Sequence, residues 1–164
     1  MIYSKKATLK INHLNMEKGN FNKANFRNAD FEEANIRKAK LIGANFINAN
    51  LKGADLEEAH LEETDLDWAI LIKANLTKCH LVRADLIGIN LEDADLSKAD
   101  LKRANCAEAN FLNANLEETN LVGAQDLSLD QLSKVKTLYN AKIDEELRII
   151  LQKKYPGLFE KPKQ

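Results

Sequence analysis

The chain has 164 residues, 45% of them hydrophobic, which is enough for one domain with a sizeable core. Its 24 Lys and Arg residues nearly balance 25 Asp and Glu residues, and the net charge of −1 excludes a global attraction to nucleic acid or to an anionic membrane. No segment approaches the roughly 20 apolar residues of a membrane span, and Cys79 and Cys106 lack the spacing of a zinc site or a disulfide framework.

The N-terminal lead-in, residues 1–8, contains no apolar run long enough for a signal peptide. We therefore expect a cytoplasmic protein, and the alternative of a signal peptide that has been removed stays open. A repeating pattern begins directly after this lead-in, at Leu9.

Residues 9–124 repeat with a period of five. Blocks written from Leu9, such as ADLSK, ADLKR, ANFLN and ANLEE, number 23 without an insertion. The third residue of each block is apolar, the first is usually Ala, and the second is Asn or Asp in 18 blocks. The exceptions at the second position are Lys10, Lys40, His60, Ile70 and His80. Such regularity indicates a repeat architecture.

A period of five fits neither an α-helix nor a flat strand. The apolar side chains would spread over every side of a helix, and they would change sides of a strand at each block. A chain that bends by about a right angle in each block keeps its first and third side chains on a common axis. Four bends close a coil of about 20 residues, and stacked coils pair their backbones about 4.8 Å apart. The pattern predicts an all-β solenoid of about six coils, with Asn or Asp at the corners.

The A(D/N)LXX pattern of residues 9–124 resembles that of the pentapeptide-repeat proteins. This resemblance implies a right-handed quadrilateral β-helix. Some members of that family bind DNA gyrase and protect it from quinolones, as acidic rods that resemble duplex DNA. Our expectation is a non-enzymatic structural or protein-interaction module with an unidentified protein partner, and a homodimer is possible. The alternative is a DNA-mimicking modulator of a topoisomerase such as gyrase.

The five-residue pattern ends before Ser128, and residues 125–164 are expected to form a helical cap and a tail. Ser128 followed by Gln131 matches a capping box, which marks the start of a helix. A second helix is expected to begin at Asp144 and to stop at Pro156. The apolar face that should seal the last coil consists of Leu147, Ile150 and Leu151. This tail also resembles the C-terminal segments of other bacterial pentapeptide-repeat proteins.

Candidate chemical groups are few. Residues 20 apart stack in neighbouring coils, so His60 and His80 should lie about 4.8 Å apart, close enough to share a metal ion. Glu63 and Asp100 are candidate third ligands, but two solvated histidines are the simpler interpretation, and no metal site is predicted. No catalytic residue, cofactor or small-molecule substrate is predicted either, because the sequence has no Ser/His/Asp order, phosphate loop or inward carboxylate pair.

One coil carries an acidic belt with a single basic residue, Lys52. The belt consists of Asp55, Glu57, Glu58, Glu62, Glu63, Asp65 and Asp67. Lys78 and Arg83 follow one coil later, so stacked columns alternate in sign, and each cross-coil pair contributes about 0.2–1 kcal/mol. A duplex mimic needs negative charge along the whole rod, so one belt bounded by basic residues makes DNA mimicry the weaker alternative.

The stretch DWAILIKA, residues 67–74, combines inward and outward apolar side chains. The register directs Ala69 and Leu71 to the axis and the neighbouring apolar side chains outward. With residues of adjacent coils, these form a candidate partner or dimer patch of Trp68, Ile70, Ile72, Ile87 and Ile47. The alternatives are that Trp68 lies flat on Gly88 or Asn48, or that the C-terminal tail, with Leu158 and Phe159, covers it.

Overall fold

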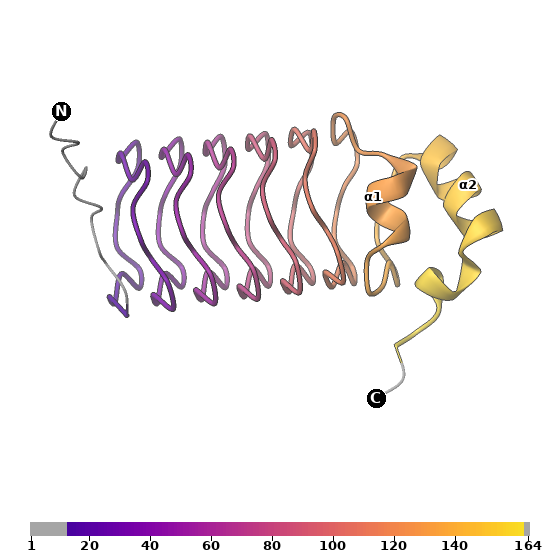
Figure 1. Cartoon of the computed structure of the whole chain (residues 1–164), viewed down its shortest axis with the longest axis horizontal. Coiled ribbons are helices and arrows are strands. Elements are labelled where there is room, and N and C mark those ends of the chain that lie inside the picture. Colours follow the sequence, from indigo (N-terminus) through magenta and orange to yellow (C-terminus); the bar gives the residue numbers. More distant parts are fainter. Residues whose placement is uncertain (1–12, 163–164) are drawn as a thin grey trace, which may run out of the picture.

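The protein is a β-solenoid whose coil contains 20 residues. The computed structural model describes residues 13–162. Parallel bridges join second-position residues of successive coils, from Asn15 with Asn35 to Asn105 with Gln125. Figure 1 shows these coils stacked along the long axis of the molecule, with the helices gathered at the C-terminal end. The 20-residue coil predicted from the sequence is therefore the repeating unit.

The solenoid axis is filled by the first and third side chains of the blocks. Alanines at the first position and Leu, Ile or Phe at the third are almost completely buried along the rod, as Ala54 and Leu56 illustrate. Near the N-terminal end Phe26, Phe31 and Phe46 pack with ring centroids 5.0–5.4 Å apart. Each fully buried Leu or Phe side chain contributes about 1.5–3 kcal/mol, so this apolar column is the main source of stability.

Threonine and cysteine side chains at the first position hydrogen-bond to the backbone inside the rod. The hydroxyl groups of Thr64 and Thr119 donate to carbonyl oxygens at 3.1 and 2.8 Å. Cys79 occupies the same position, and its Sγ lies 2.8 Å from the carbonyl oxygen of Leu56. Burial raises the pKa of both cysteine thiols, that of Cys106 to about 12. Both cysteines are thus buried and behave as small core residues, as expected.

A block in the middle of the rod satisfies four of its five backbone N–H groups through the backbone. In block 94–98 the first N–H closes a turn, and the second, third and fifth donate to neighbouring coils. The fourth N–H, on Ser97, donates to Oδ1 of Asp95 at 2.9 Å. The second position favours Asn or Asp because its side chain accepts the N–H that no backbone carbonyl accepts.

The corners lie at the fourth and fifth residues of each block, which corrects the expectation that Asn or Asp forms them. Second-position residues lie on the flat faces, where they form the bridges. Every fifth-position residue from His13 to Gly123 has a φ of +55° to +70°. This left-handed conformation costs a non-glycine residue about 1–2 kcal/mol. Cross-coil hydrogen bonds such as that from the Lys98 N–H to the Glu117 carbonyl, 2.8 Å long, help to offset that cost.

Three short helices follow the repeats: α1 (Leu129–Ser133), α2 (Glu145–Lys154) and the 3-10 helix η1 (Pro156–Phe159). The predicted capping box is present at the start of α1, where Ser128 and Gln131 exchange side-chain to backbone hydrogen bonds. None of the helices among the described residues is long and apolar enough to cross a membrane.

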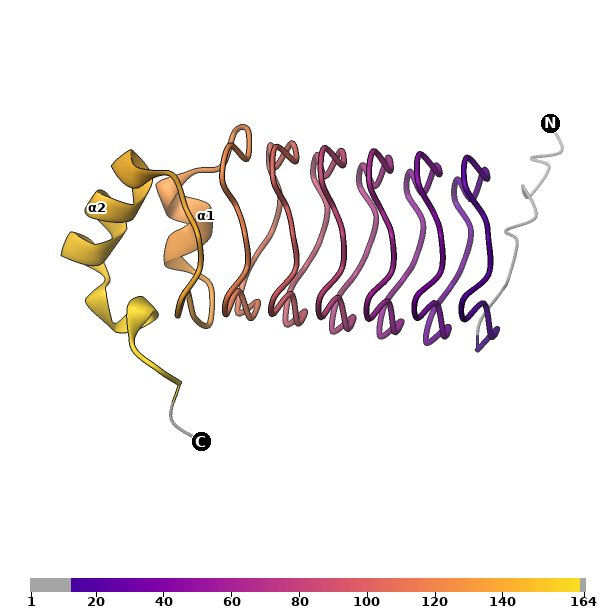
Figure 2. The same ribbon diagram turned by 180° about the vertical axis from the view of Figure 1, so that it is seen from behind.

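The bridge register changes after α1. Asn115 pairs with Thr137 and Asn120 with Lys142, so the coil spacing becomes 22 residues instead of 20. Where α1 replaces the next bridge, the side-chain nitrogen of Gln131 donates to two backbone carbonyl oxygens of the last regular coil, at 2.8 and 3.0 Å. Seen from behind, α2 lies farther along the rod than α1 (Figure 2).

The apolar face of α2 differs from the prediction at one residue. Leu151 is fully buried and Leu147 packs against the core, but Ile150 is 44% exposed. Leu147 and Leu151, one helical turn apart, form the contact stripe, and Ile150 lies beside it. The predicted lead-in, residues 1–8, lies outside the described residues.

Candidate functional site

Trp68 and Ile70 expose 53% and 40% of their surface, although the surrounding coils are otherwise regular. Trp68 lies at a corner, and Ile70 occupies the bridge position of the following face. The indole covers Gly88 of the next coil so closely that a Cβ atom there would meet the ring at 2.4 Å. Trp68 therefore packs on Gly88, as one alternative proposed, and half of its surface still faces solvent.

The C-terminal tail does not cover Trp68. The carbonyl oxygen of Leu158 accepts hydrogen bonds from the Leu138 N–H and the Thr137 hydroxyl, at 2.6 and 3.3 Å. Phe159 packs against the same end of the core. The alternative that the tail covers Trp68 is wrong, because backbone pairing holds η1 at the C-terminal end of the rod, away from the coil of Trp68 (Figure 1).

Four of the five predicted patch residues lie together. Ile47 and Ile87 are partly buried fourth-position residues at the same corner as Trp68, in the coils on either side. Ile70 lies on the adjoining face. Ile72 is partly buried at the next corner, so the width of one face separates it from Trp68.

Ile70 interrupts a column of side-chain amides. On its face Asn50 donates to Asp30 at 2.9 Å, and Asn110 donates to Asn90 at 3.0 Å. Ile70 is bridged to Asn50 and to Asn90 and can offer neither of them a hydrogen bond. Each lost hydrogen bond removes about 0.5–1.5 kcal/mol, so stability alone does not account for an isoleucine here.

Three carboxylates lie beside Trp68. Asp65 and Asp85 are bridge partners, and Asp67 precedes Trp68 in the chain. Burial raises the pKa of Asp67 and of Asp85, and repulsion from neighbouring carboxylates adds to the effect. Oδ1 of Asp85 is buried without a hydrogen-bond partner. Across residues 13–162, none of the three carboxylates forms an ion pair with a basic side chain.

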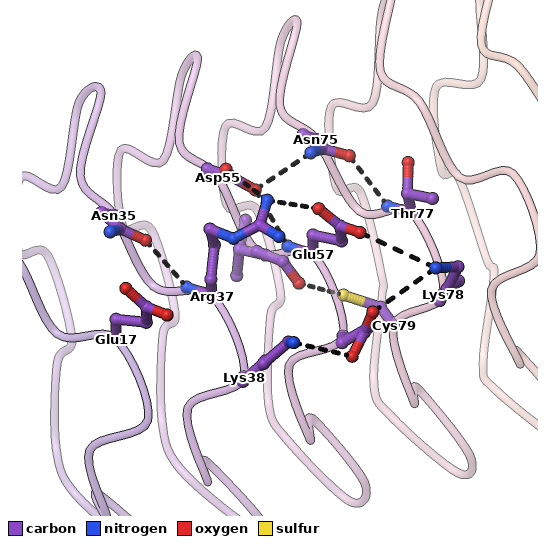
Figure 3. Close-up of polar contacts among 12 residues, drawn as sticks. Glu17, Asn35, Arg37, Lys38, Asp55, Glu57, Asn75, Thr77, Lys78 and Cys79 are labelled. Carbon is purple, nitrogen blue, oxygen red and sulfur yellow. Dashed lines mark hydrogen bonds and ion pairs between the residues drawn. The ribbon is translucent and has the colours of Figure 1, made fainter.

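Four other members of the acidic belt pair with basic side chains. Arg37 lies 3.1 Å from Asp55 and contacts Glu57, as Figure 3 shows. Glu58 lies between two lysines of the neighbouring coils, Lys38 and Lys78, at 3.4 Å from each. Glu63 pairs with Arg83. The alternating columns expected from the sequence are therefore present, and they neutralise much of the belt.

His60 and His80 form a stacked pair with ring centroids 4.7 Å apart and planes inclined by 4°. Nδ1 of His60 lies 3.3 Å from Oε1 of Glu62. Glu62 is therefore the carboxylate beside the pair, whereas the candidate Glu63 is held by Arg83. The sequence contained a signal for this contact, because a second-position side chain reaches toward the fourth residue of its own block.

These observations define a β-solenoid built on a five-residue repeat. The family model for pentapeptide repeats matches eight copies in this chain, over residues 12–46, 39–77, 49–88 and 89–125. The chain belongs to the pentapeptide-repeat family.

Solved structures of this family resemble the protein. HetL, a pentapeptide-repeat protein involved in heterocyst differentiation regulation in the cyanobacterium Nostoc sp., is 28% identical, with a TM-score of 0.57 over 82% of this chain. The match spans 58% of HetL. A form of QnrB1, a plasmid-mediated fluoroquinolone resistance protein, is 20% identical with a TM-score of 0.61, over 90% of this chain and 72% of its own. A comparison with curated protein sequences gives no match.

Proposed function

We propose that the protein is a non-enzymatic interaction module that binds a partner protein through the Trp68 surface. This surface consists of Trp68, Ile70, Ile47, Ile87, Asp65, Asp67 and Asp85. The observation that carries the proposal is Ile70, an exposed isoleucine that takes the place of a hydrogen-bonding amide beside a half-exposed tryptophan. A partner that covers Trp68 and Ile70 would gain about 25 cal/mol per Å² of apolar area removed from water.

The partner chemistry that fits this surface is a basic segment with at least one apolar side chain. Asp65, Asp67 and Asp85 have no basic partner along the described chain, and desolvation already raises the pKa of the last two. A lysine or arginine of the partner would relieve their mutual repulsion. The same cation can lie on the Trp68 indole, where a cation–π contact contributes about 0.5–2 kcal/mol. Charge and shape thus favour a basic segment with an apolar side chain as the partner of the Trp68 surface.

Trp68 is the sole tryptophan, so its fluorescence reports binding directly. The probe is a synthetic peptide of alternating Lys, Arg and Leu without aromatic residues, compared with a Glu-Leu peptide of equal length. We expect the basic peptide to shift the emission of Trp68 and to bind more weakly as salt is raised. The acidic peptide should have no effect.

Matched variants separate binding from folding. Ile70→Asn restores the amide column while it removes the apolar contact, and we expect it to weaken peptide binding at least fivefold without loss of stability. Leu112→Asn removes an exposed leucine elsewhere on the rod and should leave binding unchanged. Equal affinity of Ile70→Asn and wild type, or no response of wild type to the basic peptide, refutes the proposal.

A second copy of the chain is a competing occupant of the Trp68 surface. Light scattering distinguishes it from a basic segment: a wild-type dimer that dissociates in Ile70→Asn would replace our proposal with a homodimer. If wild type and Ile70→Asn are both monomers, a homodimer is refuted and the basic segment stands as the proposed partner of the Trp68 surface.

The acidic belt argues against a gyrase modulator that mimics DNA, because four of its seven acids are paired with basic side chains. The likeness to QnrB1 concerns the fold. A gyrase supercoiling assay with a quinolone tests this alternative. We expect no relief of inhibition at micromolar protein, and relief that is lost in Asp65→Asn/Asp67→Asn would support DNA mimicry instead.

We also infer that the rod has about six coils and that α1 and α2 close its C-terminal end. Leu132, Leu138 and Leu151 are fully buried in continuity with the last coil, which supports this role of the helices. A closed C-terminal end matters for an interaction module, because partners then bind to the side of the rod and not to that end.

A further inference from the structure

We propose that His60, His80 and Glu62 bind a transition-metal ion, with zinc as the ion that the donor set fits best. One donor atom of each residue lies within 4.8 Å of those of the other two. The site is independent of the Trp68 surface, because the histidines occupy the face of second-position residues Lys40 and Asp100, and Asp65 and Ile70 lie on other faces.

The donor chemistry suits zinc. Two imidazole nitrogens and one carboxylate oxygen are ordinary zinc ligands, with bonds of about 2.0–2.2 Å, and three protein ligands leave a fourth position for water. Ligand atoms of a tetrahedral zinc lie about 3.3 Å apart, so the side chains must close by about 1.5 Å at most. Both imidazoles and the carboxylate are partly exposed and can make that adjustment by side-chain rotation, while parallel bridges hold the backbones of His60 and His80.

Glu62 supplies independent support for a bound cation. Its Oε1 faces His60, but its Oε2 is buried and has no hydrogen-bond partner. The residues at the same position one coil before and after are aliphatic, Ile42 and Val82, so neither can supply a donor. A buried carboxylate oxygen without a partner is costly, and a metal ion that Glu62 binds through both of its oxygens would remove that cost.

The neighbouring charges have opposite effects on a cation at this site. Parallel bridges place Lys40 next to His60 and Asp100 next to His80. Lys40 opposes metal binding and Asp100 favours it, because charges separated by one coil spacing interact through partly buried surroundings. The site is therefore expected to bind zinc more tightly when Lys40 is replaced by asparagine.

Calorimetric titration with zinc chloride tests the site. We expect wild type to bind one zinc ion per chain, and His60→Asn, His80→Asn and Glu62→Gln each to bind at least tenfold more weakly. Asn is the commonest residue at the second position, so the two histidine variants supply the side-chain oxygen that this fold uses there. Circular dichroism and thermal melting of each variant check that the rod is intact.

Two further variants make the result specific. His13→Asn removes the third histidine of the chain, which pairs with Glu33 and lies outside the site, and should leave zinc affinity unchanged. Lys40→Asn should raise the affinity. Cobalt added to wild type should give the visible absorption of a tetrahedral site, and this absorption should be absent in His80→Asn. Zinc binding that is equal in wild type and His80→Asn, or no binding by wild type at 1 mM zinc, overturns the proposal.

Discussion

Asp65 and Asp85 are bridge partners on one face of the rod, and their carboxylates stack without a hydrogen-bond donor between them. Elsewhere an amide follows an aspartate in the same relationship: Asn75 donates to Asp55 at 3.0 Å, and Asn115 donates to Asp95 at 3.1 Å. The pair of carboxylates is thus a local defect in an otherwise regular ladder, and it lies within the Trp68 surface.

Replacing Asp85 with asparagine should repair this defect. The new amide can donate to Asp65, as Asn75 does to Asp55, and one of two repelling charges is removed. We expect Asp85→Asn to stabilise the protein by about 0.5–1.5 kcal/mol at pH 7, measured by urea unfolding. A decrease in stability would show that the hydrogen bond between Asp85 and the side chain of Asn105 outweighs the repulsion from Asp65.

The pH dependence of stability should reflect Asp67. Burial raises its pKa in the folded state, so just above the usual pKa range of aspartate the folded protein binds more protons than the unfolded chain. The contribution of Asp67 to stability therefore falls as pH rises through that range, and it is unfavourable at pH 7. Asp67→Asn should stabilise the protein at pH 7 and reduce the decline in melting temperature between pH 4 and pH 7. The exposed Glu160→Gln variant should keep the wild-type profile.

Substitution of Gly88 should displace the indole. Gly88 has a φ of +62°, and an alanine Cβ would overlap the Trp68 ring. Gly53→Ala is a matched control, because Gly53 has a φ of +65° and its nearest neighbour is a flexible Glu33 carbon at 3.5 Å. We expect both variants to lose about 1 kcal/mol through the backbone, and Gly88→Ala to lose more and to change the tryptophan emission. Identical behaviour of the two variants would contradict the packing of Trp68 on Gly88.

Gln131 should hold α1 to the last regular coil. Its side chain accepts from the Ser128 N–H and donates to the carbonyl groups of Cys106 and Ala109. Gln131→Ala should cost about 1–3 kcal/mol, and Gln131→Glu, which keeps the acceptor and loses both donors, should recover only part of that loss. Hydrogen exchange should accelerate at Gly123 and Gln125 before it does in the central coils. Uniform acceleration along the rod would refute a local role.

The coil and the core could be predicted because a strict period of five leaves a single way to bury the third residue of every block. The corners could not be predicted in the same way. An Asn or Asp side chain that accepts a nearby N–H can lie at a corner, but it can equally lie two residues before the corner, on the flat face. Only the backbone shows that left-handed residues such as Lys98 and Glu108 form the turns, although neither residue type favours that conformation.

The candidate sites were predictable to different degrees. Outward exposure of Trp68 and Ile70 follows from the register. The contact of Glu62 with His60 depends on the direction of side chains within one block, whereas the stacking pattern indicated Glu63 and Asp100 as candidate ligands. The exposure of Ile150 depends on how α2 is oriented against the last coil, which its apolar pattern alone does not determine.

The change from 20 to 22 residues between bridged positions also has a consequence for the behaviour of the protein in concentrated solution. An end with the regular spacing would offer a second molecule the same unpaired backbone groups that every internal coil offers its neighbour, and could seed a fibre. Beyond Asn115 and Asn120 the spacing no longer matches, α1 replaces one side of the next coil, and α2 lies farther along the rod. At this end the rod therefore has a fixed length and a poor template for end-to-end growth.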